Sequence, residues 1–171
     1  MSEHKIVNVG LIGCGEVAQV VHIPTLTNMS NWFRITYLCD VSAQALAHCN
    51  AKIHNSAKTT RDATELCSSS EVDVVMVVNS DEYHASHTIL ALQHDKHVLV
   101  EKPMSLTKRD SKAIVETEAK SKGKAMVGYM RRYAAPFEDA VKLIGGLDKI
   151  TYARVRGKTI IWLDSRMHGL T

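Results

Sequence analysis

Two kinds of segment alternate along the first three quarters of the chain. Short apolar runs rich in β-branched residues, typical of buried parallel strands, occupy residues 5–12, 33–39, 72–78, 97–100 and 124–129. Apolar residues at helical spacing predict helices from residue 17 onward and over residues 42–52, 60–66, 82–94, 107–122 and 133–144. This alternation predicts an α/β fold with a doubly wound parallel sheet and right-handed crossovers.

The end of the chain has a different pattern. Residues 149–155 alternate apolar and polar positions, and residues 159–163 are again strand-like, with no room for a crossover helix between them. We therefore predict two parts. Residues 1–130 form the sheet domain, and residues 131–171 hold a linking helix and the first strands of an incomplete second α/β domain.

Composition and charge exclude several classes of protein. The 171 residues are 45% hydrophobic and 23% charged, which is ordinary for a globular chain. The net charge of +3 is spread out, so no nucleic-acid partner is expected. No apolar stretch approaches a membrane span, so we expect a cytoplasmic protein. The four cysteines lack a C-x-x-C pair and the nine histidines lack metal-ligand spacing, so we expect reduced thiols and no metal.

The turn after the first strand carries the main candidate chemistry. Gly13, Gly15 and Ala18 form a G-x-G-x-x-A pattern between a strand and a helix, which is the dinucleotide-binding fingerprint of a Rossmann-type domain. Gly13 permits the sharp turn, and Gly15 lets the backbone approach a pyrophosphate. Glu16 and Val17 open the helix, whose free N–H groups favour phosphate. The alternative is a purely structural turn that binds no ligand.

Asp40 supports the cofactor interpretation. It ends the second predicted strand about 20 residues beyond the glycine turn, where an acidic residue accepts hydrogen bonds from the adenosine ribose. An acid there repels a 2′-phosphate, and Val41 and Ser42 add no cation. We therefore expect NAD, with NADP possible. Alternatively, Asp40 or Ser42 caps the next helix.

Taken together, these residues resemble the glucose–fructose oxidoreductase / inositol 2-dehydrogenase / MocA-like family of nicotinamide-dependent sugar oxidoreductases. The resemblance extends over roughly residues 5–156. Besides the glycine turn and Asp40, its matching pieces are His22-Ile23-Pro24, Asn79 followed by His84, residues 96–103 (KHVLVEKP) and residues 128–133 (GYMRRY).

The resemblance implies roles for several side chains. Lys102 of the Glu-Lys-Pro motif is expected beside the nicotinamide and the reacting alcohol, where a cation assists removal of the hydroxyl proton. The Lys102–Pro103 bond is a candidate cis bond. The remaining residues expected around the cofactor are Asn79, Ser80, His84, Glu101 and Arg131.

The family also implies a catalytic Asp-x-x-x-His pair in a second domain. Asp164 and His168 have this spacing but lie close to Thr171, so we expect a chain shortened relative to its family. The main hypothesis is an oxidoreductase acting on a sugar, polyol or cyclic alcohol. The alternatives are a non-catalytic NAD(P)-binding regulatory or interaction module and an unstable remnant. Exposed C-terminal strands would favour a homo-oligomer.

Overall fold

The predicted apolar strands pair into one parallel sheet in the computed structural model, which describes residues 5–152 and 154. The strands are β1 (Val7–Ile12), β2 (Phe33–Cys39), β3 (Lys58–Thr60), β4 (Val74–Val77), β5 (His97–Val100) and β6 (Ala125–Val127). Their order in the sheet is β3-β2-β1-β4-β5-β6, and every pairing is parallel. The chain therefore adds β2 and β3 on one side of β1, and then β4, β5 and β6 on its other side. This confirms the doubly wound sheet.

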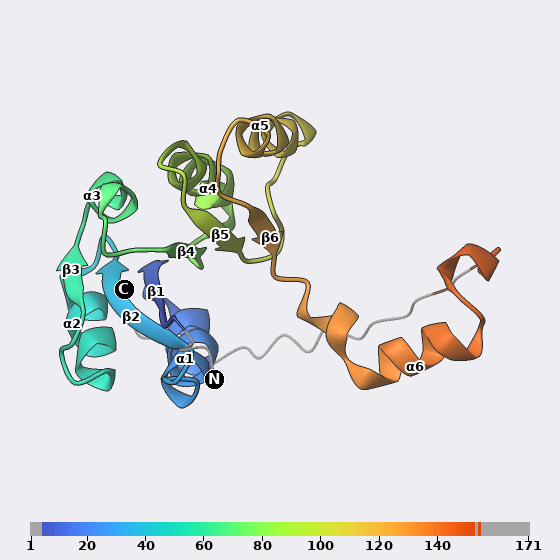
Figure 1. Ribbon diagram of the computed structural model, residues 1–171, viewed down its shortest axis with the longest axis horizontal. Helices are drawn as coiled ribbons and strands as arrows, with labels where there is room; N and C mark the ends of the chain where they lie inside the picture. The colour runs from blue at the N-terminus through green and yellow to red at the C-terminus, as the bar shows by residue number, and fades with distance from the viewer. Residues whose placement is uncertain (1–4, 153, 155–171) are drawn as a thin grey trace, which may run out of the picture. The chain divides into compact units, whose positions relative to one another are not determined.

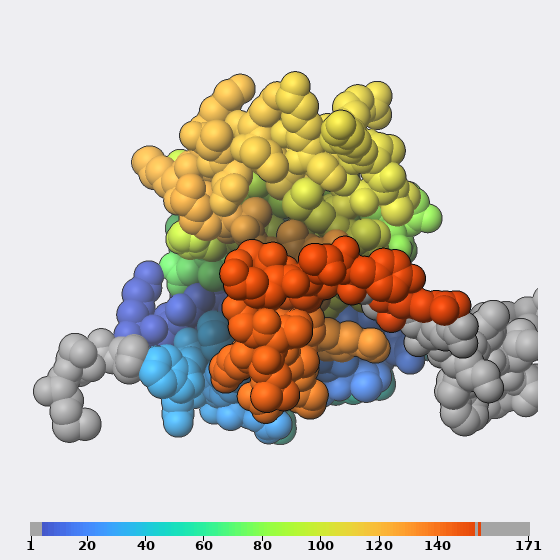
Figure 2. All heavy atoms as spheres, turned by 90° about the vertical axis from the view of Figure 1, so that its right-hand side faces the viewer, coloured from blue at the N-terminus to red at the C-terminus, as the bar shows by residue number. Residues whose placement is uncertain are grey.

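Helices cover both faces of this sheet (Figure 1). A helical segment, α1 (Ile23–Asn28), and α2 (Ala43–Lys52) lie on one face. On the other face lie α3 (Ala63–Ser68), α4 (His84–Gln93) and α5 (Lys108–Glu118). Each layer buries its own apolar cluster, with Leu38 and Leu46 in the first and Val75 and Leu92 in the second. The outer side of α5 is exposed and appears in yellow in Figure 2.

Side-chain caps fix where three of these helices begin. The Ser42 hydroxyl accepts from the Ala45 N–H at the start of α2, and the Asp62 carboxylate accepts from the Thr64 N–H at the start of α3. Thr107 accepts from the Asp110 N–H at the start of α5. Each cap satisfies one of the N–H groups that a helix leaves free at its first turn.

The segment around Thr60 differs from its prediction. A helix over residues 60–66 was expected, but residues 58–60 instead form the edge strand β3, and the helix begins after Asp62. Two β-branched threonines favour the strand, and the capping aspartate delays the helix. The consequence is that Arg61 lies in the turn that follows β3.

The helix after the glycine turn also differs in which side chains it buries. Residues 18–22 form a π-helical segment ahead of α1, and only Ala18, Ile23 and Leu26 are buried there. Val20 and Val21, two apolar residues within the predicted helix, are exposed. The wider π turn shifts the apolar face relative to an α-helical pattern.

The chain divides into two units, Met1–Tyr129 and Met130–Thr171. In the second unit, short 3₁₀ turns (Met130–Tyr133 and Leu147–Lys149) flank α6 (Ala135–Leu143), and Gly145 and Gly146 follow with positive φ. Residues 149–152 were expected to begin a strand but hold a 3₁₀ end and irregular backbone. The remainder of that predicted strand, apart from Arg154, and the predicted strand at 159–163 lie outside the described residues.

Candidate cofactor site

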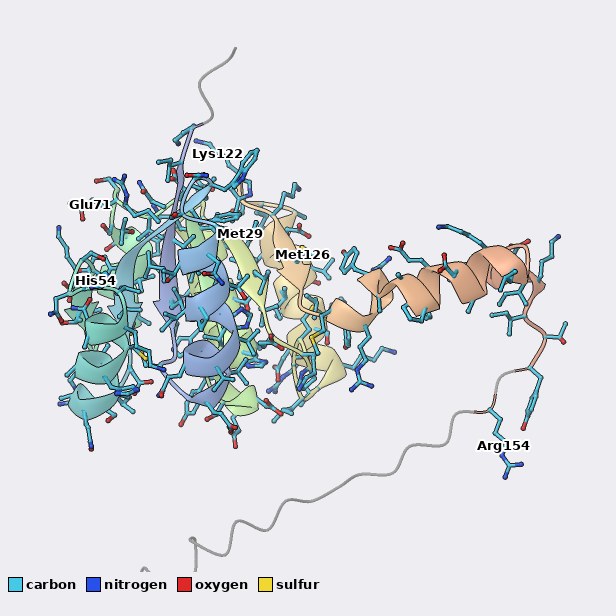
Figure 3. The ribbon with its side chains drawn as sticks, turned by 90° about the horizontal axis from the view of Figure 1, so that it is seen from below. Met29, His54, Glu71, Lys122, Met126 and Arg154 are labelled. Atoms are coloured by element: carbon cyan, nitrogen blue, oxygen red, sulfur yellow. The ribbon has the colours of Figure 1, made fainter. Side chains whose placement is uncertain are left out.

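A cavity of about 590 Å³ lies at the carboxyl ends of β1, β2 and β4. The residues that line it are Ile12, Gly13, Gly15, Glu16, Val17, Cys39, Asp40, Val41, Arg61, Ala63, Val78, Asn79, Ser80, Tyr83 and His87. Because β1 is flanked by β2 and β4, the cavity lies where the strand order reverses. Open α/β sheets bind ligands at this point. Glu71 and Lys122, labelled in Figure 3, precede β4 and β6 and lie at the opposite edge of the sheet.

The glycine turn forms the floor of the cavity. Gly13 has φ +106° and donates its N–H to the Cys39 carbonyl at 2.8 Å. A Cβ on Gly13 would lie 2.6 Å from the Asn79 nitrogen, so only glycine allows β1 and β4 to approach here. A Cβ on Gly15 would meet no atom within 4 Å. Gly15 therefore exposes bare backbone where a bound group can approach closely.

Asp40 is held by backbone donors at the end of β2. Its Oδ2 accepts from the Cys14 N–H at 2.7 Å, and its Oδ1 accepts from the Ser42 N–H at 2.8 Å. Ser42, and not Asp40, caps α2. The Asp40 carboxylate therefore lies over the glycine turn, on the cavity wall, with further lone pairs available to a ribose hydroxyl.

Asn79 and His87 form a side-chain pair on the β4 side of the cavity. Asn79 Nδ2 lies 2.9 Å from His87 Nδ1, and the Tyr83 ring stacks on the imidazole with 6.0 Å between ring centroids. Burial, with a smaller contribution from His84, lowers the pKa of His87 below its ordinary value. The neutral ring can accept the amide hydrogen at Nδ1. Asn79 Oδ1 has no hydrogen-bond partner within the described part of the chain.

His84 does not line the cavity, because its ring is enclosed between two loops. It is 1% exposed, with Nδ1 2.7 Å from the Pro103 carbonyl oxygen and Nε2 3.0 Å from the Asn79 carbonyl oxygen. The side chain thus ties the loop after β4 to the loop after β5. His84 therefore supports the loops next to the cavity and is not exposed to it.

The Glu-Lys-Pro motif follows β5 and is tied to the helix after the glycine turn. Glu101 Oε1 lies 3.0 Å from His22 Nε2, and Glu101 Oε2 accepts from the Lys102 N–H at 3.1 Å. The Lys102–Pro103 bond is cis, and the Lys102 side chain is exposed. Glu101 is therefore fixed through both oxygens, whereas the Lys102 amine has no partner among the described residues.

Of the predicted site residues, seven line the cavity: Gly13, Gly15, Glu16, Val17, Asp40, Asn79 and Ser80. Glu101 and Lys102 follow the neighbouring strand β5 but are not part of its lining. Arg131 belongs to the second unit. Asp164 and His168 lie outside the described residues.

Sequence reasoning missed three polar lining residues. Tyr83 and His87 lie one turn apart at the start of α4, on either side of the His84 that was singled out instead. Arg61 was missed because the strand that precedes it was not predicted. The capping Asp62 after two threonines was the available signal for that strand end.

The cysteines contribute no reactive group to the site. All four are buried, and none is in a disulfide. Burial raises the pKa of Cys14 above the physiological range, that of Cys39 to about 11 and that of Cys67 to about 12. The thiols therefore stay protonated and act as small apolar groups. Among the residues that the structure describes, no group of three potential ligands could hold a metal.

The geometry of the cavity fits a dinucleotide. The glycine turn leaves bare backbone open to the cavity, and the Asp40 carboxylate lies beside it. The sequence model of the oxidoreductase family with an NAD-binding Rossmann fold matches residues 7–129. The chain belongs to this family. The predicted family, the Rossmann-type fold and NAD as the cofactor type of that family are thereby confirmed.

Similar proteins extend this comparison. The inositol 2-dehydrogenase/D-chiro-inositol 3-dehydrogenase of Lacticaseibacillus casei is 35% identical over 129 residues, which are 75% of this chain and 37% of that protein. Inositol 2-dehydrogenase 3 of Saccharopolyspora erythraea is 33% identical over 144 residues, 82% of this chain and 42% of its own length. This chain thus spans 37% to 42% of the length of these relatives.

A solved relative shares the fold. Myo-inositol dehydrogenase from Lactobacillus casei, in complex with NAD(H) and myo-inositol, superposes with a TM-score of 0.78 at 30% identity. The match covers 82% of this chain and 42% of that one. Within the described residues, no helix is both long and apolar enough to span a bilayer.

Proposed function

We propose that this chain binds NAD(H) across the carboxyl edge of its sheet. The observation that carries the proposal is the turn in which Gly15 leaves open backbone beside the fixed carboxylate of Asp40. The turn would hold the pyrophosphate, and Asp40 would accept hydrogen bonds from the adenosine ribose. Glu16, Val17, Asn79 and Ser80 would complete the contacts from the lining of the cavity. On the far side, β5 supplies Glu101 and Lys102.

We propose further that the complete catalytic unit transfers a hydride between the nicotinamide, which supplies the redox chemistry, and a CH–OH group. Lys102 would stabilise the alkoxide that develops as the hydroxyl proton leaves, because its exposed amine has no other partner among residues 5–152 and 154. His22 and Glu101 would position the loop that carries it. Asp164 and His168 stay candidates for the partner acid–base pair, and Arg131 stays a candidate for cofactor contact, whereas His84 would act by positioning the loops after β4 and β5.

The substrate class we propose is a cyclic polyol or sugar. The support is the family membership together with relatives named as inositol dehydrogenases. Several hydroxyl groups on one ring would require several polar side chains. We therefore propose that the substrate contacts further polar side chains besides Lys102.

Self-association is a separate proposal. Phe137, Leu143 and Leu147 of the second unit expose large apolar side chains, and Leu143 is 90% exposed. Apolar surface of this kind is typical of interfaces. Multi-angle light scattering across a dilution series tests it, and a monomer at every concentration contradicts it.

Calorimetric titration with NADH tests the binding proposal. We expect binding by the unaltered chain and its loss in Gly15→Val, with no change in thermal unfolding, because that side chain enters open space. Binding unchanged in Gly15→Val contradicts the proposal.

Oxidation of a polyol and sugar panel with NAD then tests catalysis. Lys102→Met should abolish turnover and retain NADH binding. Binding without turnover in the unaltered chain supports the alternative of a non-catalytic NAD-binding module.

A further inference from the structure

Arg61 enters the cavity beside Asp40 because of strand pairing. Cys39 of β2 is in register with Thr60 of β3, and the Asp40 N–H donates to the Thr60 carbonyl at 3.3 Å. The residues that follow this pair, Asp40 and Arg61, therefore leave adjacent strands side by side. Both line the cavity. The end of the cavity nearest β2 and β3 thus carries one carboxylate and one guanidinium.

The guanidinium of Arg61 is free to bind a ligand. It makes no hydrogen bond, ion pair or ring contact within the described part of the chain, although carboxylates are near in sequence. Asp62 accepts from the Thr64 N–H, and Glu65 accepts from the Tyr37 and Thr60 hydroxyls. Of the cavity-lining residues that the structure describes, Arg61 alone carries a fixed positive charge.

The charges at this end of the cavity are arranged differently from those in a site that excludes phosphate. An isolated carboxylate repels a 2′-phosphate on the adenosine ribose. Here both oxygens of Asp40 already accept backbone hydrogen bonds, which spreads part of its charge. Arg61 adds a planar set of donors that matches a phosphate group. Attraction by the guanidinium thus offsets repulsion by the carboxylate.

We propose that Arg61 determines cofactor specificity by binding the 2′-phosphate of NADP(H), so that the chain accepts both NADP(H) and NAD(H). This proposal rests on the proposed binding of NAD(H) at the same cavity. It assigns the adenosine end two polar groups with separate tasks. Asp40 takes a ribose hydroxyl, and Arg61 takes the phosphate when one is present.

Binding titrations with NADH and NADPH test the proposal without any need for turnover. The variant is Arg61→Gln, which removes the charge and keeps a polar side chain. The matched control is Arg34→Gln, which removes an exposed arginine near the amino end of β2, away from the cavity. Adenosine 2′,5′-bisphosphate and 5′-AMP serve as probes of the adenosine end alone. Thermal unfolding verifies that each variant folds.

We expect the unaltered chain to bind both cofactors. Arg61→Gln should weaken NADPH and the bisphosphate roughly tenfold, with NADH and 5′-AMP changed less than about twofold. Equal weakening of both cofactors would mean that Arg61 contacts the adenine instead, and it overturns the proposal. An equal effect of Arg34→Gln also overturns it, because net charge alone would then explain the result.

The two proposals fail in different ways. If NADH binds and NADPH does not, the role assigned to Arg61 is wrong and the cofactor site stands. If neither cofactor binds to a folded chain, both the cofactor site and the specificity proposal are wrong.

Discussion

The two sides of the cavity are held together by different kinds of hydrogen bond. On the β2 side, backbone N–H groups of Cys14 and Ser42 fix the Asp40 carboxylate. On the side of β4 and β5, histidine rings make the links. His87 pairs with Asn79, and His84 bridges the two loops.

This difference has consequences for how each side responds to change. A backbone N–H neither titrates nor disappears on substitution of its own side chain, so the β2 side depends on a single side chain, Asp40. An imidazole changes its donors and acceptors near neutral pH, and it is lost with one substitution. We therefore expect the β4–β5 side to be the more sensitive to histidine substitution and, through His87, to acid.

Gly13 joins the two sides, so its substitution should have the largest effect. In Gly13→Ala, the new Cβ would lie 2.6 Å from the Asn79 nitrogen, on a residue with φ +106°. We expect the free energy of unfolding to fall by about 3 kcal/mol or more, measured by urea denaturation. The ends of β1 and β4 should move apart, and NADH binding should be lost as a result.

Gly15→Ala is the matched control for that experiment. Its Cβ meets no atom within 4 Å, and the residue lacks positive φ. Stability should therefore change by less than about 0.5 kcal/mol. If Gly13→Ala is as stable as Gly15→Ala, then the close approach of β1 and β4 does not constrain this turn.

His84→Phe tests the link between the loops after β4 and β5. The substitution keeps a ring in a fully buried position but leaves the carbonyls of Asn79 and Pro103 without the imidazole nitrogens that face them. We expect a loss of about 2 kcal/mol in the free energy of unfolding. His48→Phe, on the exposed side of α2, is the control and should change stability little. Equal effects of the two substitutions would contradict a linking role for His84.

Asp40→Ala tests the β2 side in the same way. It removes the acceptor for two backbone N–H groups in a partly exposed position, where water can replace part of what is lost. We expect destabilisation of about 1 kcal/mol, less than for His84→Phe. The NADH affinity should fall roughly tenfold, as calorimetry would show. A larger stability loss than in His84→Phe would reverse the comparison between the two sides.

The sequence predicted one side of the site better than the other. The second strand, Phe33–Cys39, is long and apolar, and its limits as well as the position of Asp40 were predicted correctly. Strand β3 was missed because it has three residues, Lys58-Thr59-Thr60, and no apolar position. An edge strand of this kind is defined by its pairing with β2, which a local pattern does not contain. Arg61 was missed for the same reason.

The histidines show a second limit of sequence reasoning. His84 and His87 lie on one short helix start, and the motif drew attention to His84. Which of the two reaches the cavity depends on how α4 is rotated against the loop after β5, and that rotation follows from tertiary packing. The exposure of Val20 has a similar cause, because the π-helical segment changes which side chains face the sheet.

The smallest expected effect concerns acid and His87. Burial lowers the pKa of this imidazole in the folded chain below its value of 6.5 in the unfolded one. Below pH 6.5 the unfolded chain therefore takes up a proton first, so stability contributed by the neutral ring is present at higher pH and lost as pH falls. Protonation also removes the Nδ1 acceptor that faces the Asn79 amide.

Urea denaturation at pH 7.5 and pH 5.5 should show a loss of under about 1 kcal/mol in the free energy of unfolding of the unaltered chain, and a smaller loss in His87→Gln. The carboxylates whose pKa values are lowered, such as Asp73, titrate only at more acidic pH. The change in stability between pH 7.5 and pH 5.5 therefore comes from the histidines. An unchanged pH dependence in His87→Gln would show that the β4–β5 side is no more sensitive to acid through this residue than the β2 side.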